Sequence, residues 1–581
     1  MKKYSKAFVF LLIVTAIFPC RGLSQTDALT KFEKSSLKGT PGYFRVGKTG
    51  EGQWWFITPG NQLFYYRGIC AINRAGGAGG RFAGLTKYAE TVDMKYNYQQ
   101  SPDNFINACI QKVHGLGFNA FGAWTTEEFF NKGVPFTEIM EFFKEGPFLP
   151  QAGNKRGLPD IFDPKWVVAI DKNARALCSP LRYSEDLIGY FTDNEIGFGK
   201  ADDFGLDPGF QAGQFDFSLL RVILGMESGK PAFEYTWDFL LKRYDNSFEK
   251  LSKAWDVKIS SKDDIRKLNE NKTKIPGEAY STDARAFVKR YAEKYFKLTN
   301  KAIRRYDPNH LILGCRFGGP PPTDILDAIK PWTDVISANN YQPTLYERYD
   351  TVYQYTGLPL LIGEFSWNTD PYKVIPFSFE PEKKMSVKER MFLKGEETLL
   401  RTARHDGIVG FTWYRWVQGT CTDNRFFDGI VNYGDSLEMH CGELGKLLPT
   451  LEKVRMDAAN GLWKKAPVNN GEMTLFPNRL RPNWDHYLRI GFVAGKPEVQ
   501  VYGWKMKGKV LKFSKKQNLI YVKLEVIFEE ATGISKNYEG GKGIYEIKLM
   551  RSGEKFYGNF TGTYNGSPVR GNVKAFYFPK I

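Results

Sequence analysis

Two glutamates occupy positions from which their carboxyl groups could act together on one substrate. Glu195 ends the segment 188–195, and Glu364 follows the apolar segment 358–362. If both segments are strands of a parallel barrel, both side chains lie at its carboxyl-terminal face, where barrel enzymes place their reactive groups. One carboxyl group would then protonate a leaving oxygen while the other attacks an anomeric carbon, which is the chemistry of a retaining glycosidase.

A second Asn-Glu dipeptide in the chain serves as a comparison. Asn269-Glu270 lies in the polar segment 267–272 with no apolar run before it, so we expect its carboxylate to be solvated. A single Asn-Glu dipeptide is therefore a weak signal. The hypothesis of a catalytic pair rests on two glutamates that both stand at the ends of strand-like segments.

Short apolar segments alternate with helix-like segments over most of the chain. The predicted strands are 64–71, 118–123, 136–140, 187–192, 311–316, 335–339, 358–362 and 408–413. Helical patterns between them cover 102–116, 166–177, 281–306 and 387–403. Eight such units predict an α/β fold, namely a (β/α)8 TIM barrel with an inserted helical region.

Other segments would surround this barrel. A small N-terminal hairpin is predicted by the apolar residues 54–57, the turn 58–61 and the strand that follows. The largest insertion, 200–283, contains a helical pattern over 233–255 and is expected to wall the active-site face. A helix over 439–456 would close the barrel, followed by a linker at 464–471.

The last part of the chain changes to alternating strands and turns. The strands expected there are 498–504, 510–513, 519–528, 544–550, 555–561 and 573–578. They predict an all-β accessory module, a sandwich or a small barrel, which either binds carbohydrate or acts as a structural buttress. The predicted domains are therefore a signal peptide at 1–24, a catalytic barrel with its hairpin at 25–463, and the accessory module at 472–581.

The N-terminus has the pattern of a cleaved export signal. Lys2, Lys3 and Lys6 precede an apolar run over 7–18, which is too short to span a bilayer. We expect an exported protein, periplasmic or extracellular. The residues before Cys20 form a poor lipidation motif, so a lipid anchor, with weak membrane association, is the less favoured alternative.

Composition limits the function classes. Hydrophobic residues make up 42% and charged residues 25% of the 581 residues, which excludes disorder as the main state. Aromatic residues reach 15%, which suits either stacking on sugar rings or a large aromatic core. The formal net charge of +17 occurs without a zinc spacing or an RNA-binding signature, so we expect no nucleic-acid partner.

The cysteines and histidines predict no metal site and no cofactor. The chain has five His and no Cys-x-x-Cys motif. Cys70 and Cys315 lie in apolar runs and are expected to be buried thiols. Cys421 and Cys441 lie near each other in a loop-rich stretch, and whether they pair stays open.

Several of these segments carry a resemblance to known enzymes. Asn194-Glu195 and Gly363-Glu364 resemble the clan of retaining (β/α)8 glycoside hydrolases with an Asn-Glu acid/base. More narrowly, the chain over 42–456 resembles the β-agarase family, glycoside hydrolase family 50. The segments that carry this likeness are 117–124, 162–164, 189–195, 313–317 and 362–365.

The resemblance implies roles for three residues. Glu195 would be the acid/base, Glu364 the nucleophile, and Asn194 a hydrogen-bond partner of the sugar 2-hydroxyl. The implied substrate is a polysaccharide or its oligosaccharides, either agarose or another β-galactan or β-glucan. Tyr341 could orient Glu364. The other side chains at strand ends that could bind substrate are Trp124, Arg316, Trp367, Trp413 and Trp416.

Two other function classes remain as alternatives. The chain could be a non-catalytic glycan-binding protein on a barrel scaffold, although the presence of both carboxyl groups argues against this. It could also bind nucleic acid or an anionic surface through its basic C-terminal part, in which case binding would fall steeply with salt. The sequence does not distinguish endo from exo action.

Overall fold

The structure is a computed structural model, and it describes most of the chain. The described residues are 31–77, 86–150, 157–199, 202–203, 217–341, 344–368, 387–418, 426–477, 488–500, 506–528 and 541–580. The predicted signal peptide, Cys20 and Cys421 lie outside them. Within these ranges, no helix combines the length and the apolar character needed to cross a membrane.

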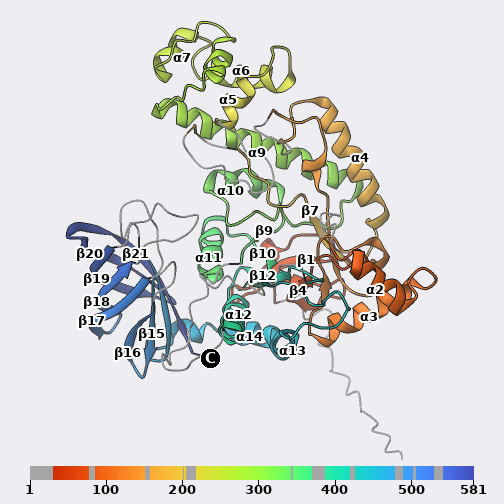
Figure 1. Ribbon diagram of the computed structural model, residues 1–581, viewed down its shortest axis with the longest axis vertical. Coiled ribbons are helices and arrows are strands. Elements are labelled where there is room, and N and C mark those ends of the chain that lie inside the picture. The colour runs from red at the N-terminus through yellow and green to blue at the C-terminus, as the bar shows by residue number, and fades with distance from the viewer. Residues whose placement is uncertain are drawn as a thin grey trace, which may run out of the picture.

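The centre of the molecule is a curled sheet of eight parallel strands with helices around it (Figure 1). The strand order is β8-β7-β6-β5-β4-β12-β10-β9. All eight segments that the sequence predicted are strands of this sheet. Their bounds are β4 Tyr66–Ile69, β5 Ala120–Phe121, β6 Phe136–Ile139, β7 Leu187–Phe191, β8 Leu311–Ile312, β9 Ile336–Asn339, β10 Leu360–Phe365 and β12 Ile408–Trp413.

The helices that cover the sheet begin and end at recognisable signals. The Asp163 side chain accepts a hydrogen bond from Lys165 N and caps α4, and Gly357 ends α11 at a φ of 68°. The bounds are α2 Thr86–Tyr96, α3 Pro102–Gly115, α4 Pro164–Leu181, α9 Glu278–Tyr306, α10 Thr323–Ile329, α11 Leu345–Thr356 and α12 Val387–Ala403. Short 3-10 helices are η1 Lys34–Ser36, η2 Glu127–Phe129, η3 Phe142–Lys144, η4 Lys330–Trp332 and η6 Leu462–Lys465.

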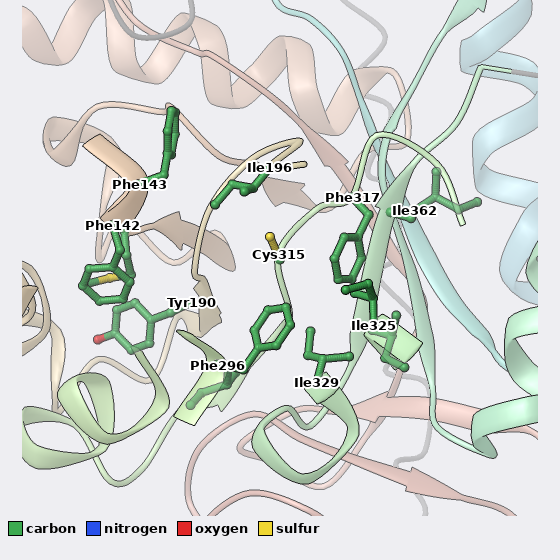
Figure 2. Close-up of a cluster of buried hydrophobic side chains, with 14 of the residues drawn as sticks. Phe142, Phe143, Tyr190, Ile196, Phe296, Cys315, Phe317, Ile325, Ile329 and Ile362 are labelled. Carbon is green, nitrogen blue, oxygen red and sulfur yellow. The ribbon is translucent and has the colours of Figure 1, made fainter. Parts of the chain in front are cut away.

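Alternating residues of the parallel strands serve two apolar layers. Leu361 and Val409 face the interior of the curled sheet, whereas their neighbours Ile362 and Ile408 belong to the larger layer between the sheet and the helices. Figure 2 shows this outer layer beside β7 and β8. Because both faces are covered, these strands read as continuous apolar runs in the sequence.

Three helices of the insertion, α5, α6 and α7, pack on α9, and α8 packs on α5 (Figure 1). Their bounds are α5 Leu219–Leu224, α6 Pro231–Lys242, α7 Phe248–Trp255 and α8 Asp264–Glu270. The 29 residues of α9 span about 44 Å, and the five residues of β7 only about 17 Å. Since α9 runs back to the start of β8, its first half extends beyond the carboxyl ends of the strands, so the insertion stands on the expected side of the sheet.

Two helix predictions were wrong because the chain breaks inside them. The pattern over 233–255 divides into α6 and α7, since Asp245 and Asn246 adopt positive φ and the Ser247 side chain caps α7. The pattern over 439–456 divides into α13 Cys441–Leu447, η5 Leu448–Thr450 and α14 Leu451–Ala458. Pro449 has no N–H to donate, which accounts for the change of helix at that point.

A small antiparallel sheet precedes the first parallel strand. The predicted hairpin is confirmed as β2 Trp54–Ile57 paired with β3 Leu63–Phe64. A further strand that the sequence did not predict, β1 Arg45–Lys48, pairs with β2.

An antiparallel, barrel-like sheet of eight strands, called here the C-terminal sheet, ends the described chain. Its order is β16-β15-β14-β21-β20-β19-β18-β17. The bounds are β14 Gly471–Pro477, β15 Leu488–Val493, β16 Lys496–Gln500, β17 Met506–Lys516, β18 Leu519–Phe528, β19 Gly541–Ser552, β20 Lys555–Tyr564 and β21 Ser567–Pro579. The sequence prediction missed β14 and β15; β14 begins at Gly471, the residue predicted to end the linker.

The close contact between β7 and β8 can be tested at Gly189. A Cβ atom at Gly189 would lie 2.2 Å from the Leu311 backbone oxygen, so Gly189→Ala forces the strands apart. We expect it to lower the free energy of unfolding by about 1–3 kcal/mol or more, measured by urea denaturation. Gly442→Ala is the control, because a Cβ there meets no atom within 4 Å. Equal stability of the two variants would contradict this strand spacing.

Candidate active site

Glu364 reaches the interior of the curled sheet because β10 is irregular at Gly363. The register of β10 shifts after Ile362 against both neighbouring strands. Such a bulge changes which side chains face inward. Ile362 and Phe365 both pack in the outer layer, and the Glu364 carboxylate between them contacts interior side chains.

Glu195 lies at the carboxyl end of β7, and its backbone conformation is unusual. Its φ is 51°, and its N–H donates to the Arg316 oxygen at 2.9 Å. Five consecutive strands, β4 to β8, are each followed shortly by a non-glycine residue with positive φ. These residues are Ala71, Trp124, Glu141, Glu195 and Arg316. Left-handed conformations in non-glycine residues cluster at functional sites, and all five stand at the edge where the site lies.

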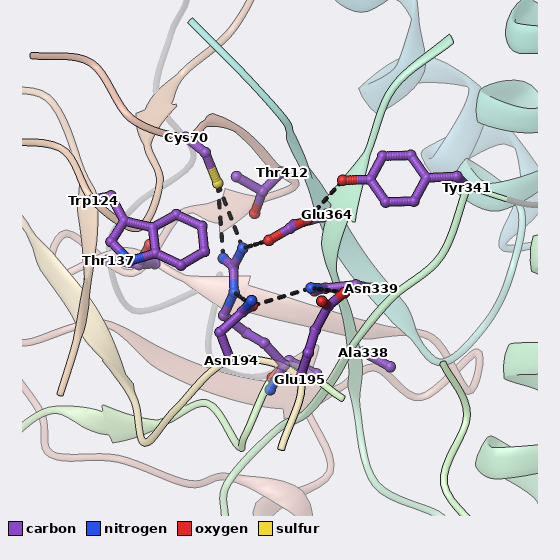
Figure 3. A network of polar contacts seen from close by, with 12 residues as sticks. Cys70, Trp124, Thr137, Asn194, Glu195, Ala338, Asn339, Tyr341, Glu364 and Thr412 are labelled. Carbon is purple, nitrogen blue, oxygen red and sulfur yellow. Dashed lines mark hydrogen bonds and ion pairs between the residues drawn. The ribbon is translucent and has the colours of Figure 1, made fainter. Parts of the chain in front are cut away.

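A chain of hydrogen bonds connects the two glutamates (Figure 3). The Asn339 Nδ2 donates to Glu195 Oε1 at 3.0 Å and to Asn194 Oδ1 at 3.1 Å. The Arg316 Nε donates to the same Asn194 oxygen at 2.9 Å, and another guanidinium nitrogen of Arg316 donates to Glu364 Oε1 at 2.7 Å. Both carboxyl groups are thereby held in one polar network at the carboxyl ends of β7, β8, β9 and β10.

Arg316 is the central member of this network. Its side chain is 0% exposed, and it lies 4.7 Å from the Trp124 ring and 5.0 Å from the Phe191 ring. Burial alone would lower the pKa of the guanidinium, but Cys70 and the Glu364 carboxylate raise it above its ordinary value. Arg316 is therefore a permanently charged, buried side chain. Its guanidinium contacts Glu364 and is not exposed for binding substrate.

Tyr341 contacts the other oxygen of Glu364. Its hydroxyl donates to Glu364 Oε2 at 2.6 Å, as the sequence analysis anticipated. Burial and the nearby carboxylate raise the pKa of Tyr341 well above its ordinary value, so the phenol keeps its proton. Both oxygens of Glu364 thus accept a hydrogen bond.

Three tryptophans that were expected to bind substrate lie elsewhere. Trp413 and Trp416 are 0% exposed, and Trp367 is nearly so; all three pack in the outer layer. Trp413 lies there because β12 carries an extra residue at Val409, where its register against β10 shifts, so that Val409 faces inward while Phe411 and Trp413 face outward. By contrast, Trp124 is half-buried at the site, and its Nε1 donates to Glu141 Oε1 at 3.2 Å.

Several residues of the site were not anticipated. Asn339 joins Asn194 to Glu195. Gly363 leaves room for it, because a Cβ there would lie 2.4 Å from Asn339 Oδ1. Tyr414 follows the outward Trp413 and packs edge-on against Trp124 with ring centroids 6.3 Å apart. The inward position of Tyr414 depends on the irregularity of β12, and the contact between Asn339 and Gly363 joins distant segments, so regular strand alternation indicates neither.

The cysteines near and beyond the site are buried thiols. Cys70 lies 3.7 and 3.8 Å from two Arg316 nitrogens, and burial raises the pKa of its thiol to about 11. Cys315 and Cys441 are also buried and free. Over the described ranges, no group of three or more His, Cys, Asp or Glu side chains could hold a metal ion.

Comparison with known proteins shows what the chain is similar to. No protein-family model matches the chain. β-Agarase B of Vibrio sp. (strain JT0107) is 21% identical over 350 residues, which are 59% of this chain and 35% of that protein. β-Agarase A of the same strain is 22% identical over 443 residues, covering 67% of this chain and 43% of that protein. The chain is similar to β-agarases. It spans less than half the length of either relative.

Solved structures support the same likeness at the level of the fold. An exo-β-agarase superposes with a TM-score of 0.59 at 18% identity, covering 76% of this chain and 72% of that one. The agarase AgWH50C gives a TM-score of 0.57 at 19% identity, covering 75% and 69%. The resemblance to the β-agarase family stated from the sequence is confirmed.

The buried aromatic layer behind β12 predicts a pH dependence of stability. His440 stacks on Trp413 with ring centroids 5.8 Å apart, and burial lowers the pKa of its imidazole to about 4. Between pH 6.5 and 4 the unfolded chain binds a proton that the folded protein does not. Stability therefore falls as the pH is lowered through this window, by up to about 3 kcal/mol in total.

The measurement is the free energy of unfolding by urea at pH 7.5 and at pH 4.5, for wild type and His440→Phe. We expect the substitution to remove part of the loss at low pH. His114 is exposed on α3, so His114→Gln is the control and should follow the wild type. A wild-type pH dependence in His440→Phe would contradict the burial of a neutral imidazole.

Proposed function

We propose that the protein is a glycoside hydrolase of the β-agarase type, which cleaves a β-linked polysaccharide with retention of configuration. The observation that carries this proposal is the pair Glu195 and Glu364 at the carboxyl ends of β7 and β10, connected through Asn339, Asn194 and Arg316. Double displacement requires two carboxyl groups that flank the glycosidic bond, and two glutamates at one face of the parallel sheet can meet this requirement. The likeness to β-agarases supports the same chemistry.

The environments of the two glutamates support different roles for them. Glu364 is 6% exposed, and donors from Arg316 and Tyr341 fix both oxygens, which suits an ionised, oriented nucleophile. Glu195 is only partly buried, which lets an acid/base exchange protons with water. The Oδ1 of Asn194 already accepts two hydrogen bonds, so its Nδ2 is the group that would donate to the sugar 2-hydroxyl.

The reaction then takes two steps. Glu364 attacks the anomeric carbon while the glycosidic bond breaks and the proton of Glu195 passes to the leaving oxygen. In the second step Glu195 accepts a proton from water, the water oxygen bonds to the anomeric carbon, and the bond to Glu364 breaks. Trp124 and Tyr414 offer aromatic surface to the sugar at the same face.

The fold proposed to support this reaction is a complete (β/α)8 barrel. The strand order of the curled sheet follows the chain order, and a parallel bridge between Phe317 and Ala338 connects its two outer strands. The domain boundaries at 25–463 and 472–581 are supported by a separate apolar core in the C-terminal sheet.

The substrate and the location of the enzyme are part of the proposal. Agarose is favoured because the curated relatives are agarases, and other β-galactans and β-glucans are the alternatives. Export is supported by the basic start and the apolar run at 7–18, with lipidation at Cys20 as the less favoured form.

Substitution of each glutamate tests the assignment. Glu364→Gln should abolish release of oligosaccharides from the accepted glycan, and Glu195→Gln should lower kcat by about 10²–10⁴-fold. Glu270→Gln alters the exposed second Asn-Glu dipeptide and should leave kcat unchanged. Products from agarose, other galactans and mixed β-glucans are separated by chromatography, which also distinguishes endo from exo action.

Azide rescue distinguishes the two roles. With an activated aryl β-glycoside, azide should replace the lost nucleophile of Glu364→Ala and give the α-glycosyl azide, because only one displacement then occurs. Glu195→Ala should give the β-glycosyl azide after two displacements. The reverse pattern would exchange the roles. Glycan binding by calorimetry without hydrolysis of any glycan would favour the non-catalytic binding protein instead.

The contact between Tyr341 and Glu364 gives a smaller, graded prediction. A hydrogen bond to a charged group is worth about 1.5–3 kcal/mol, so Tyr341→Phe should lower kcat by about ten- to a hundredfold. Tyr355 also donates to a carboxylate, Asp327, at 2.8 Å but on the surface. Tyr355→Phe is therefore the matched control, and an equal effect of both substitutions would remove Tyr341 from the site.

A further inference from the structure

Helix α11 lies between the C-terminal sheet and the parallel sheet (Figure 1). Its Tyr346 packs edge-on against Phe576 and Phe578 of β21, with ring centroids 5.9 and 5.0 Å apart. All three side chains are buried. This aromatic cluster fixes the first turn of α11 against the C-terminal sheet.

A buried charge cluster strengthens the same contact. The Asp350 carboxylate on α11 lies 2.9 Å from the Lys555 Nζ of β20 and 3.2 Å from the Lys574 Nζ of β21. The His405 imidazole faces it at 3.7 Å. Burial raises the pKa of Asp350, but His405 and Lys555 outweigh burial and hold it below its ordinary value, so the carboxylate is ionised. A buried ion pair of this kind orients its partners strongly, because breaking it leaves a charge without compensation.

A neighbouring side chain and the start of α11 lead to the candidate active site. The Tyr349 hydroxyl donates to the Ala338 oxygen of β9, next to Asn339. Asn339 donates to Glu195. Tyr341, which donates to Glu364, stands three residues before Thr344, the N-cap of α11. One helix is thus connected to both glutamates.

We propose that the C-terminal sheet is a positioning element for the reaction: by holding α11 through Lys555, Lys574 and the aromatic cluster, it sets Tyr341 against Glu364. Lys555 and Lys574 are positioning residues, far from the reacting atoms. This inference rests on the proposed hydrolase function and assigns the C-terminal sheet a part in it.

A second set of contacts attaches the C-terminal sheet without Lys555 or Lys574. Arg401 of α12 pairs with Glu472 of β14 at 3.2 Å and lies 4.4 Å from the Phe578 ring. Glu472 also pairs with Arg489 of β15 at 2.8 Å. Because this attachment does not involve Lys555 or Lys574, their substitution should loosen α11 without detaching the sheet.

The test uses the full chain carrying Lys555→Met and Lys574→Met together. We expect kcat to fall by about three- to tenfold with KM changed less than about twofold, since a displaced catalytic contact affects the reaction more than ground-state binding. In a Tyr341→Phe background the same two substitutions should change kcat by less than about 1.5-fold, because the contact through which they act is already gone. The conservative pair Lys555→Arg and Lys574→Arg should restore most of kcat.

Lys523→Met is the matched control within the C-terminal sheet. Lys523 pairs with Glu546 at 2.8 Å on β18 and β19, and both side chains are half-exposed. The control should leave kcat unchanged, both in the wild type and in the Tyr341→Phe background. If the double substitution does not fold, Lys574→Met alone, at a half-exposed lysine, provides the same comparison with a smaller effect.

Hydrogen exchange of residues 336–341 and 344–356 gives a readout without substrate. Faster exchange there in the lysine variants, but not in Lys523→Met, is expected. An inactive wild type would defeat the proposed function while leaving this exchange result interpretable. An unchanged kcat with a lowered melting temperature would overturn the proposal and make the C-terminal sheet a stabiliser only. The proposal would also be overturned if the effects of the lysine substitutions and of Tyr341→Phe on kcat were fully additive.

Discussion

The ion pair between Arg316 and Glu364 is the interaction on which the rest of the site depends. A guanidinium that is fully removed from water is costly unless an ionised partner and further acceptors surround it. Glu364 supplies the charge, Asn194 supplies an acceptor, and the rings of Trp124 and Phe191 cover the guanidinium. The same contacts orient the carboxylate, so the groups that make this cation tolerable are also the groups that prepare the proposed nucleophile.

The backbone conformation at the carboxyl edge of the sheet, around this ion pair, destabilises the folded state to some extent. Non-glycine residues in left-handed conformations cost about 1–3 kcal/mol each, and five stand at this edge. The apolar layer behind it offsets that cost, since Ile196, Cys315 and Phe317 flank Glu195 and Arg316 and pack against Phe296 (Figure 2). Regular apolar packing on one side of the strands thus supports irregular polar geometry on the other.

The sequence predicted the parts of this arrangement that follow from local pattern. All eight parallel strands were found because each is buried on both faces and reads as an apolar run. Glu195 and Glu364 were found because they end such runs. Trp413 was misplaced because an extra residue in β12 interrupts strand alternation, so that Tyr414 turns inward instead. Asn339 was missed because its role arises only when the carboxyl ends of β7, β9 and β10 meet. The break inside 233–255 depends on positive φ at polar residues, and the break inside 439–456 occurs at Pro449; a periodicity of apolar residues detects neither.

The absence of a side chain at Gly363 links two positions that are 24 residues apart, since the amide oxygen of Asn339 occupies the space that a Cβ would need. A larger residue at 363 is compatible only with a smaller residue at 339. A smaller residue at 339 would lack the amide group that contacts Glu195. The two positions are therefore expected to change together or not at all in related chains. Such paired variation would mark members in which this arrangement of the two glutamates has been given up, even where both glutamates are still present.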